Sequence, residues 1–349
     1  MGTIKVIKKW DLKSNSWNNK VNDEDKKRAL SIAEYGLIRH DESSQINYIL
    51  LADGCRVENH TKDSSHIREN RAGIANILSY FESKKENYKI ELLLVDNDAP
   101  LAEESKVLAS YIDFLSRKST TKTVNVIGLS KCGVMSFDML KYLKSPFSKL
   151  KARVYSVSSP YTGTIMASPL LLESEVKNII SSKIGESALA DKITAAFMKL
   201  YYSIMSNSHM DLDIAVPHYV PDYLKANYDP TFLQNIFSDT NLSSITNVRH
   251  YENICTAIDD TTLKNSLKSG NLVALGLCIL NDTLFAGKSD GMVSLESQQK
   301  IESYYPFEHS ASKIISSCHG ALSTPIYANE LLNIVNANMQ NEPKLQRIR

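Results

Sequence analysis

Residues 124–133 read Val-Asn-Val-Ile-Gly-Leu-Ser-Lys-Cys-Gly, and this stretch decides the fold. The apolar run over 124–129 is typical of a buried strand, and it leads directly into Ser130 and then into a helical pattern. A serine on a sharp turn between a strand and a helix projects its hydroxyl above the sheet edge, where the next backbone amide faces any oxyanion that forms. The sequence therefore predicts a strand, a tight turn at Ser130 and a helix over 134–143.

The same alternation of apolar strands and amphipathic helices continues on both sides of this turn. Further strands are predicted over 46–52, 90–95, 152–157, 248–258 and 313–317. Further helices are predicted over 67–82, 101–115, 189–205 and 325–335. Continuous apolar strands that alternate with helices are typical of a parallel sheet covered on both faces. The predicted fold class is therefore α/β, with a mainly parallel central sheet flanked by helices.

The alternation stops after Pro160, and no convincing strand follows between 166 and 242. The predicted helix over 189–205 has apolar residues on two faces, which leaves two interpretations open. It is either a core helix of the same domain or part of a cap that covers an apolar site. We expect residues 1–165 and 243–349 to form one core domain, with a helical cap (lid) inserted as residues 166–242.

Composition excludes several classes of protein. The chain of 349 residues has 40 Lys and Arg against 39 Asp and Glu, so a chain-wide basic surface for nucleic acid is excluded. No apolar run reaches the roughly 20 residues of a membrane span, and the first residues lack the apolar segment of a secretory signal. We therefore expect a cytoplasmic protein, with export by a signal-independent route, as for a bacterial effector, as the alternative.

The cysteines are odd in number, far apart and without a Cys-x-x-Cys pair, so they read as free thiols in a reducing compartment. They are Cys55, Cys132, Cys255, Cys278 and Cys318. Three of them, Cys55, Cys132 and Cys318, adjoin the segments proposed below for the site. We expect these three to make the site sensitive to oxidation.

A nucleophilic serine needs a base and an acid that orients the base, and in this fold they follow the serine in the order acid, then histidine. Of the eight histidines, His319 lies after the last predicted strand and before the final helix, where the base belongs. For the acid, Asp290 lies in a glycine-bounded turn before that strand. Asp259 and Asp260 compete, because they directly follow the predicted strand 248–258. We favour Asp290.

Four segments of this chain resemble motifs of the α/β-hydrolase superfamily, and within it of the bacterial triacylglycerol lipases and esterases. They are VIGLSKCG at 126–133, SSPYTGT at 158–164, DGMVS at 290–294 and HGAL at 319–322. The resemblance implies Ser130 as nucleophile, Asp290 as acid and His319 as base. One departure is Cys132, which stands where the usual Gly-x-Ser-x-Gly motif has its second glycine.

A second departure concerns the oxyanion hole. These lipases carry His-Gly after the strand that supplies the first donor, and this chain has Asp53-Gly54-Cys55. The backbone amide of Cys55 or Gly54 is then the first donor, and that of Lys131 the second. An acidic side chain beside a developing negative charge is unfavourable unless Asp53 points away.

The resemblance implies a carboxylic ester hydrolase that works through an acyl-enzyme and needs no metal or organic cofactor. An acyltransferase or thioesterase on the same fold is one alternative, and a catalytically inactive binding protein of this fold is another. The expected partner is a small-molecule or lipid ester, with transient contact to a lipid surface through the cap and no nucleic acid. The sequence does not determine the oligomeric state.

Overall fold

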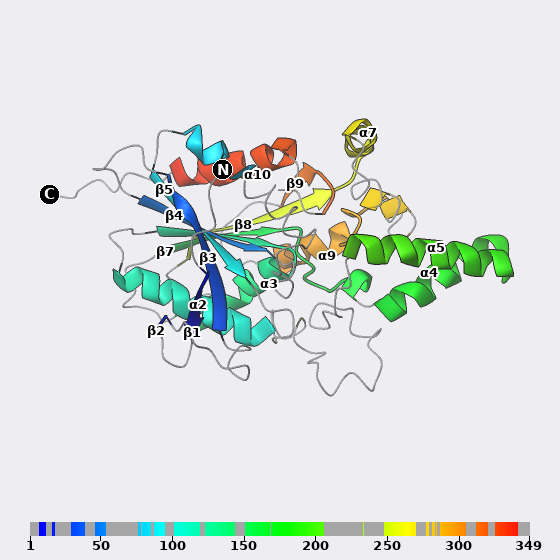
Figure 1. Cartoon of the computed structure of the whole chain (residues 1–349), viewed down its shortest axis with the longest axis horizontal. Helices are drawn as coiled ribbons and strands as arrows, with labels where there is room; N and C mark the ends of the chain where they lie inside the picture. The colour runs from blue at the N-terminus through cyan, green and yellow to red at the C-terminus, as the bar shows by residue number, and fades with distance from the viewer. Residues whose placement is uncertain are drawn as a thin grey trace.

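The structure is a computed structural model of the chain (Figure 1). It describes residues 7–11, 16–17, 29–38, 46–53, 76–77, 79–84, 87–94, 101–118, 123–143, 151–167, 169–205, 233, 248–269, 277–278, 281–282, 284, 287–304, 312–319 and 325–340. None of the helices in these ranges is both long and apolar enough to cross a membrane.

A single sheet runs through the molecule in the order β2-β1-β3-β5-β4-β6-β7-β8-β9. Its strands are β1 (Ile7–Asp11), β2 (Ser16–Trp17), β3 (Ala29–Ile38), β4 (Ile46–Asp53), β5 (Asn87–Leu94), β6 (Thr123–Leu129), β7 (Lys151–Val157), β8 (Val248–Ala257) and β9 (Lys313–Ser316). The strands from β5 to β9 in this order are mutually parallel, while β3, β1 and β2 add an antiparallel edge. The predicted α/β class with a mainly parallel sheet is confirmed.

The antiparallel edge is what the sequence did not predict. β1 contains Lys8 and Lys9, and β3 carries Ser31, Glu34 and Gly36 among its apolar residues, so neither is a continuous apolar run. The register of β3 against β5 also shifts between Glu34 and Gly36. The prediction relied on continuous apolar runs, and antiparallel strands do not require such runs.

Helices cover both faces of the sheet, as Figure 1 shows with α2 and α3 on one side and α10 on the other. The described helices are α2 (Leu101–Lys118), α3 (Lys131–Asp138), α4 (Pro169–Ile184), α5 (Ala188–Met205), α7 (Asp260–Ser269), α9 (Leu295–Gln299) and α10 (Pro325–Gln340). Short 3-10 turns lie at η2 (Met139–Tyr142), η3 (Ile165–Ala167) and η8 (Lys300–Tyr304).

The central strands alternate their side chains between two apolar layers. Leu50, Val126 and Val154 belong to the layer under α2 and α3. Their neighbours Ile49, Ile127 and Tyr155 belong to the layer under α10. Because both faces are covered, successive residues of one strand must all be apolar, which explains the continuous apolar runs.

The turn at Ser130 is tighter than the sequence indicated. Helix α3 begins at Lys131, directly after Ser130, instead of at Val134, and it ends in the 3-10 turn η2. Two glycines, Gly128 and Gly133, leave room for the backbone to turn this tightly. A Cβ on Gly128 would lie 2.4 Å from Cys132 O, and one on Gly133 would lie 1.8 Å from Ser159 Oγ. The position that must be glycine after Ser130 is therefore Gly133, one residue later than the second glycine of the Gly-x-Ser-x-Gly motif. Cys132, which occupies the motif position, is buried.

Helices α4 and α5 form a hairpin that projects from the body of the molecule (Figure 1). α5 matches the helix predicted over 189–205, whereas α4 was not predicted, and its two faces are less clearly distinguished by sequence. At the hairpin root Met166, Leu172 and Tyr201 share an apolar cluster with Leu277 and Cys318. The described part of 166–242 is therefore helical and packs beside the residue that precedes His319.

The close contact at Gly133 is testable. We expect Gly133→Ala to lower the free energy of unfolding by about 1–3 kcal/mol, because the added Cβ overlaps Ser159 Oγ and lies 2.6 Å from Ser156 Oγ. Urea unfolding measures this cost. In a Ser159→Ala background the nearest obstacle is gone, so the cost should shrink. An equal cost in both backgrounds would show that the packing against Ser159 is not the reason for the glycine.

Candidate active site

Ser130 sits at the end of β6 in a strained backbone conformation. Its φ of 52° and ψ of −126° lie outside the regions that an L-residue readily adopts. Two backbone hydrogen bonds keep it there: Ser130 N donates to Val157 O at 2.8 Å, and Gly133 N donates to Ser130 O at 2.9 Å. Strain of this kind persists where the surrounding structure holds it and is concentrated at functional sites. The side chain of Ser130 is half-buried, so it remains accessible.

Asp290 lies in a tight turn that uses one of its own oxygens. Asp290 Oδ1 accepts hydrogen bonds from Met292 N at 3.0 Å and from Val293 N at 2.8 Å. Gly291 takes a φ of 91°, and a Cβ there would lie 2.5 Å from Leu277 O. The Asp-Gly pair of the sequence motif is therefore required by the turn itself. The other oxygen, Oδ2, is left to face the neighbouring segments.

His319 is brought to Asp290 by two hydrogen bonds. His319 N donates to Asp290 O at 2.9 Å, and the ring nitrogen Nδ1 lies 2.8 Å from Asp290 Oδ2. The Asp290 side chain is 0 % exposed and that of His319 is 10 % exposed. An imidazole that meets a buried carboxylate through Nδ1 carries its proton there, so Nε2 is the nitrogen that can accept one.

The competing acid, Asp259, has another role. Asp259 Oδ1 accepts hydrogen bonds from Thr262 N at 2.8 Å and Thr262 Oγ1 at 3.0 Å, at the start of α7. Although partial burial acts to raise it, hydrogen bonds from Ser316 and Thr262 hold the pKa of the Asp259 carboxyl below its ordinary value. Asp260 is the first residue of α7. Of the three candidates, Asp290 is the one that contacts His319.

Sheet topology places the three proposed residues at one edge. β6, β8 and β9 are parallel, so their carboxyl ends lie on the same side of the sheet. Ser130 follows β6, Asp290 lies in the connection after β8, and His319 follows β9. Open α/β sheets bind their ligands at this edge. Among the described residues, the other histidine is His250, which lies within β8 and not at this edge. The remaining six lie outside the described residues: His40, His60, His66, His209, His218 and His309.

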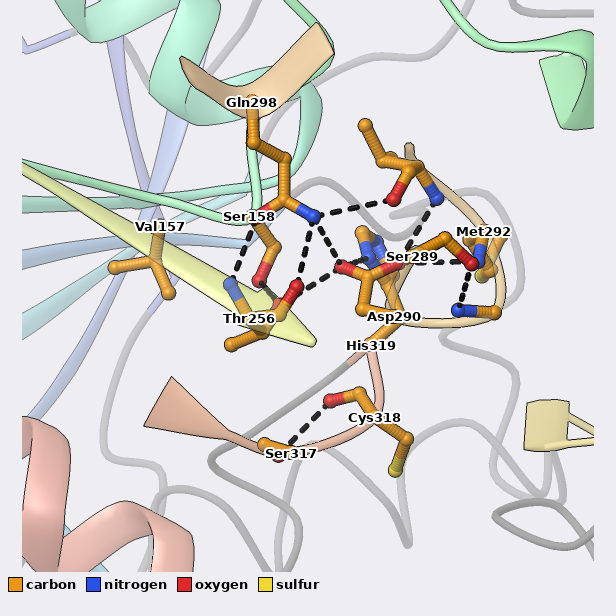
Figure 2. Close-up of polar contacts among 12 residues, drawn as sticks. Val157, Ser158, Thr256, Ser289, Asp290, Met292, Gln298, Ser317, Cys318 and His319 are labelled. Atoms are coloured by element: carbon orange, nitrogen blue, oxygen red, sulfur yellow. Dashed lines mark hydrogen bonds and ion pairs between the residues drawn. The ribbon is translucent and has the colours of Figure 1, made fainter. Parts of the chain in front are cut away.

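Sequence reasoning missed two polar residues that contact Asp290 Oδ2 and a third that contacts one of them (Figure 2). Thr256 Oγ1 donates to it at 2.8 Å, and Gln298 Nε2 approaches it at 3.4 Å. Ser158 Oγ in turn contacts Thr256 Oγ1. Thr256 lies in an ordinary β-type run and Gln298 in a short polar helix, so no local pattern distinguished them. The signal for Ser158 was its place in the 158–164 motif.

The motif at 158–164 docks onto the segment that follows Asp290. Thr162 N donates to Ser297 Oγ at 3.1 Å, and Ser297 Oγ donates to Gly163 O at 3.0 Å. Thr164 Oγ1 donates to Met292 O, inside the acid turn. Two of the four motif segments, 158–164 and 290–294, are therefore in direct contact, although more than a hundred residues separate them in the chain.

Of the proposed oxyanion donors, Lys131 is described, whereas Gly54 and Cys55 lie outside the described residues. The side chain of Lys131 is 1 % exposed, and its Nζ lies 3.8 Å from Glu104 Oε2 at the start of α2. The side chain is thus turned into the protein, and the backbone amide remains the group proposed for the oxyanion. Nothing further is described of Gly54 and Cys55.

The thiols near the site are buried. Cys132 and Cys318 are almost fully enclosed, and burial raises the pKa of the Cys318 thiol to about 12. Burial likewise raises the pKa of Cys255 to about 12. Thiolates are the reactive form, so burial and a raised pKa disfavour reaction of Cys255 and Cys318 at neutral pH. Burial of Cys132 and Cys318 argues against the expected oxidation sensitivity of the site, which stays a prediction.

The described residues contain no group of three or more His, Cys, Asp or Glu side chains that could hold a metal ion. The chemistry available from the described site residues is that of a strained serine, an imidazole and a buried carboxylate. Strand order, the turn at Ser130 and the acid-before-histidine order together define an α/β-hydrolase fold.

Among comparisons with known proteins, the one with solved structures found similar chains. No protein-family model matches the chain, and no curated protein does. A lipase-esterase related protein from Clostridium acetobutylicum has 14% identity and a TM-score of 0.40, over 88% of this chain and 98% of that one. The Pyrococcus furiosus esterase Pf2001 has 12% identity and a TM-score of 0.41, over 95% of each chain. The rice cell wall degrading esterase LipA from Xanthomonas oryzae has 13% identity and a TM-score of 0.33, over 89% and 85%. These scores are too low to carry an argument, so the fold assignment rests on the topology above.

Burial of the thiols predicts slow chemical modification. With a pKa of about 12, a thiol is a thiolate in roughly one molecule in ten thousand at about pH 8. We expect Ellman's reagent to titrate at most one cysteine quickly in the native protein and all five in concentrated guanidinium chloride. A Cys55→Ser variant should show no fast thiol. Two or more fast thiols in the native wild type would contradict the buried placement of Cys132, Cys255, Cys278 and Cys318.

Proposed function

We propose that this protein is a serine hydrolase of carboxylic esters, with Ser130 as nucleophile, His319 as base and Asp290 as acid. The observation that carries the proposal is the 2.8 Å contact between His319 Nδ1 and the fully buried Asp290 Oδ2. It lies at the same sheet edge as the strained, accessible Ser130. A buried acid paired with Nδ1 leaves Nε2 to take a proton from a nearby hydroxyl, which is the arrangement that activates a serine.

The proposed reaction has two steps. Ser130 Oγ attacks the ester carbonyl while His319 Nε2 takes its proton, and Asp290 stabilises the imidazolium that forms. The backbone amide of Lys131, with that of Cys55 or Gly54, holds the oxyanion of the tetrahedral intermediate. The imidazolium then protonates the leaving alcohol. Water, deprotonated by the same imidazole, attacks the acyl-enzyme, and the imidazolium returns the proton to Ser130 Oγ as the carboxylic acid leaves.

The α4–α5 hairpin supports an apolar or lipid-like substrate. Its tip exposes three large apolar side chains: Ile184 at 47 %, Leu189 at 59 % and Ile193 at 41 %. Leu189 and Ile193 are four residues apart on α5, so they share one face of that helix. We propose that residues 166–242 act as a cap and that this apolar tip makes transient contact with a lipid surface.

Replacement of the nucleophile tests the reaction. We expect purified Ser130→Ala to lose at least about a thousandfold of the turnover of p-nitrophenyl acyl esters, because the residual environment cannot replace an activated hydroxyl. A fluorophosphonate probe should label the wild type and fail to label Ser130→Ala. Circular dichroism and thermal unfolding verify that the variant is folded.

The same assay separates the alternatives. Wild type that equals Ser130→Ala across chain lengths, and that takes no fluorophosphonate, would indicate a binding protein on a hydrolase fold. Labelling of Ser130 with acyl transfer to an added alcohol or thiol in preference to water would indicate an acyltransferase. Faster turnover of acyl thioesters than of matched esters would indicate a thioesterase.

The apolar tip is tested separately. We expect Leu189→Ser combined with Ile193→Ser to reduce binding to phospholipid vesicles about tenfold, because each side chain loses part of its transfer free energy. Turnover of a short, soluble ester should not change. Leu267→Ser on α7 is the matched control, since Leu267 is also 59 % exposed but lies on another element. Equal vesicle binding by the double variant and wild type would contradict the lipid contact.

A further inference from the structure

One oxygen of Asp290 organises the surroundings of the base. Asp290 Oδ1 is occupied by the two amides of its own turn, so Oδ2 is the oxygen that meets His319. Thr256 Oγ1 lies 2.8 Å from the same oxygen, as close as the imidazole nitrogen. The hydroxyl and the imidazole therefore share Oδ2, and each limits where the other can lie.

The direction of these hydrogen bonds follows from the donors available. An ionised carboxylate accepts hydrogen bonds and donates none, so the single hydroxyl proton of Thr256 points at Asp290. The oxygen of Thr256 is then the acceptor for Ser158 Oγ. The two hydroxyls form a series in which Ser158 donates to Thr256 and Thr256 donates to Asp290. Charge-assisted hydrogen bonds are stronger than neutral ones, and a series of them polarises each member.

Both hydroxyls are held in place by their backbones. The side-chain amide of Gln298 binds Thr256 twice, since Oε1 accepts from Thr256 N at 2.8 Å and Nε2 donates to Thr256 O at 2.9 Å. Ser158 adopts a φ of 54° directly after β7, and its amide donates to Ile254 O at 3.0 Å. All three side chains are buried. Figure 2 shows Ser158, Thr256 and Gln298 gathered on one side of Asp290.

Two of the other titratable groups described around Asp290 are thiols. Cys318 and Cys255 both interact with the Asp290 charge, and their raised pKa values of about 12 keep them neutral near pH 7. Beyond them lie Cys278, next to Cys318, and Glu302, next to Cys255. The hydroxyl series therefore acts on the Asp290 carboxylate without a competing cation among these groups.

We propose that Thr256 and Ser158 are positioning residues, two hydroxyls in series that orient Asp290 toward His319 and share its negative charge. The role rests on the proposed function, because it matters for catalysis only if His319 acts as the base. Without the Thr256 hydroxyl the carboxylate would be less stabilised and would bind the imidazolium proton more tightly. The base would then be protonated over a wider pH range, and its orientation would be less defined.

The test measures the imidazole itself. We expect the pKa of His319, followed by NMR and assigned with His319→Gln, to rise in Thr256→Val, with its proton affinity increasing about tenfold. Ser158→Ala should produce a smaller rise, about twofold, because it removes the outer hydroxyl. Thr256→Ser, which keeps the hydroxyl, should return the pKa to the wild-type value. Thr194→Val, a buried threonine whose hydroxyl bonds within α5, is the control and should leave the pKa unchanged.

Ester turnover is the second readout. The acid limb of the kcat/KM profile should move to higher pH in Thr256→Val, with kcat lowered about tenfold and KM little changed. An unchanged His319 pKa in Thr256→Val overturns the inference, and Ser158→Ala decides in the same way if Thr256→Val does not fold. The titration needs no substrate. A shifted pKa in a protein without Ser130-dependent turnover would therefore leave the hydroxyl series standing and refute the esterase proposal alone.

Discussion

Burial of the Asp290 carboxylate is the constraint on which the site depends. A buried charge is costly unless hydrogen bonds replace its water, so Asp290 must be surrounded by donors. Its own turn provides two backbone amides, β8 provides Thr256, α9 provides Gln298 and the segment after β9 provides His319. Four separate parts of the chain therefore have to meet at one carboxylate. The His319 imidazole is positioned because it is one of the required donors.

The segment at 158–164 is joined to the turn that contains Asp290. Gly163 and Thr164 are tied to Ser297 and Met292, and Ser158 reaches Thr256 from the other end of the segment. β7 thus ends by supporting both the strained Ser130, through Val157 O, and the acid. The turn at Ser130 and the Asp290–His319 pair share one supporting segment, which links their geometries.

The helical hairpin adds an outer layer to this arrangement. Its root packs with Leu277 and Cys318, and Met292 of the acid turn packs against the same cluster. Its tip carries exposed apolar residues and lies away from the sheet (Figure 1). The hairpin therefore contacts the residue beside His319 at one end and exposes apolar surface at the other.

The sequence by itself determined the parallel centre of the sheet, because strands covered on both faces must be continuously apolar. Its local turn chemistry also pointed to Ser130, Asp290 and His319, which the structure places at one edge of that sheet. It did not identify β1 to β3 or α4, whose patterns mix polar and apolar residues. Thr256 and Gln298 could not be found from the sequence, since a strand threonine and a helix glutamine become significant only beside a buried carboxylate. The 158–164 motif included Ser158 but did not indicate its contact with Thr256. Gly133 must also be glycine for a tertiary reason, because Ser156 and Ser159 occupy the space that a Cβ there would need. Local sequence patterns reflect the secondary structure and turns of a segment, whereas the tertiary structure decides which distant groups form hydrogen bonds to a buried charge.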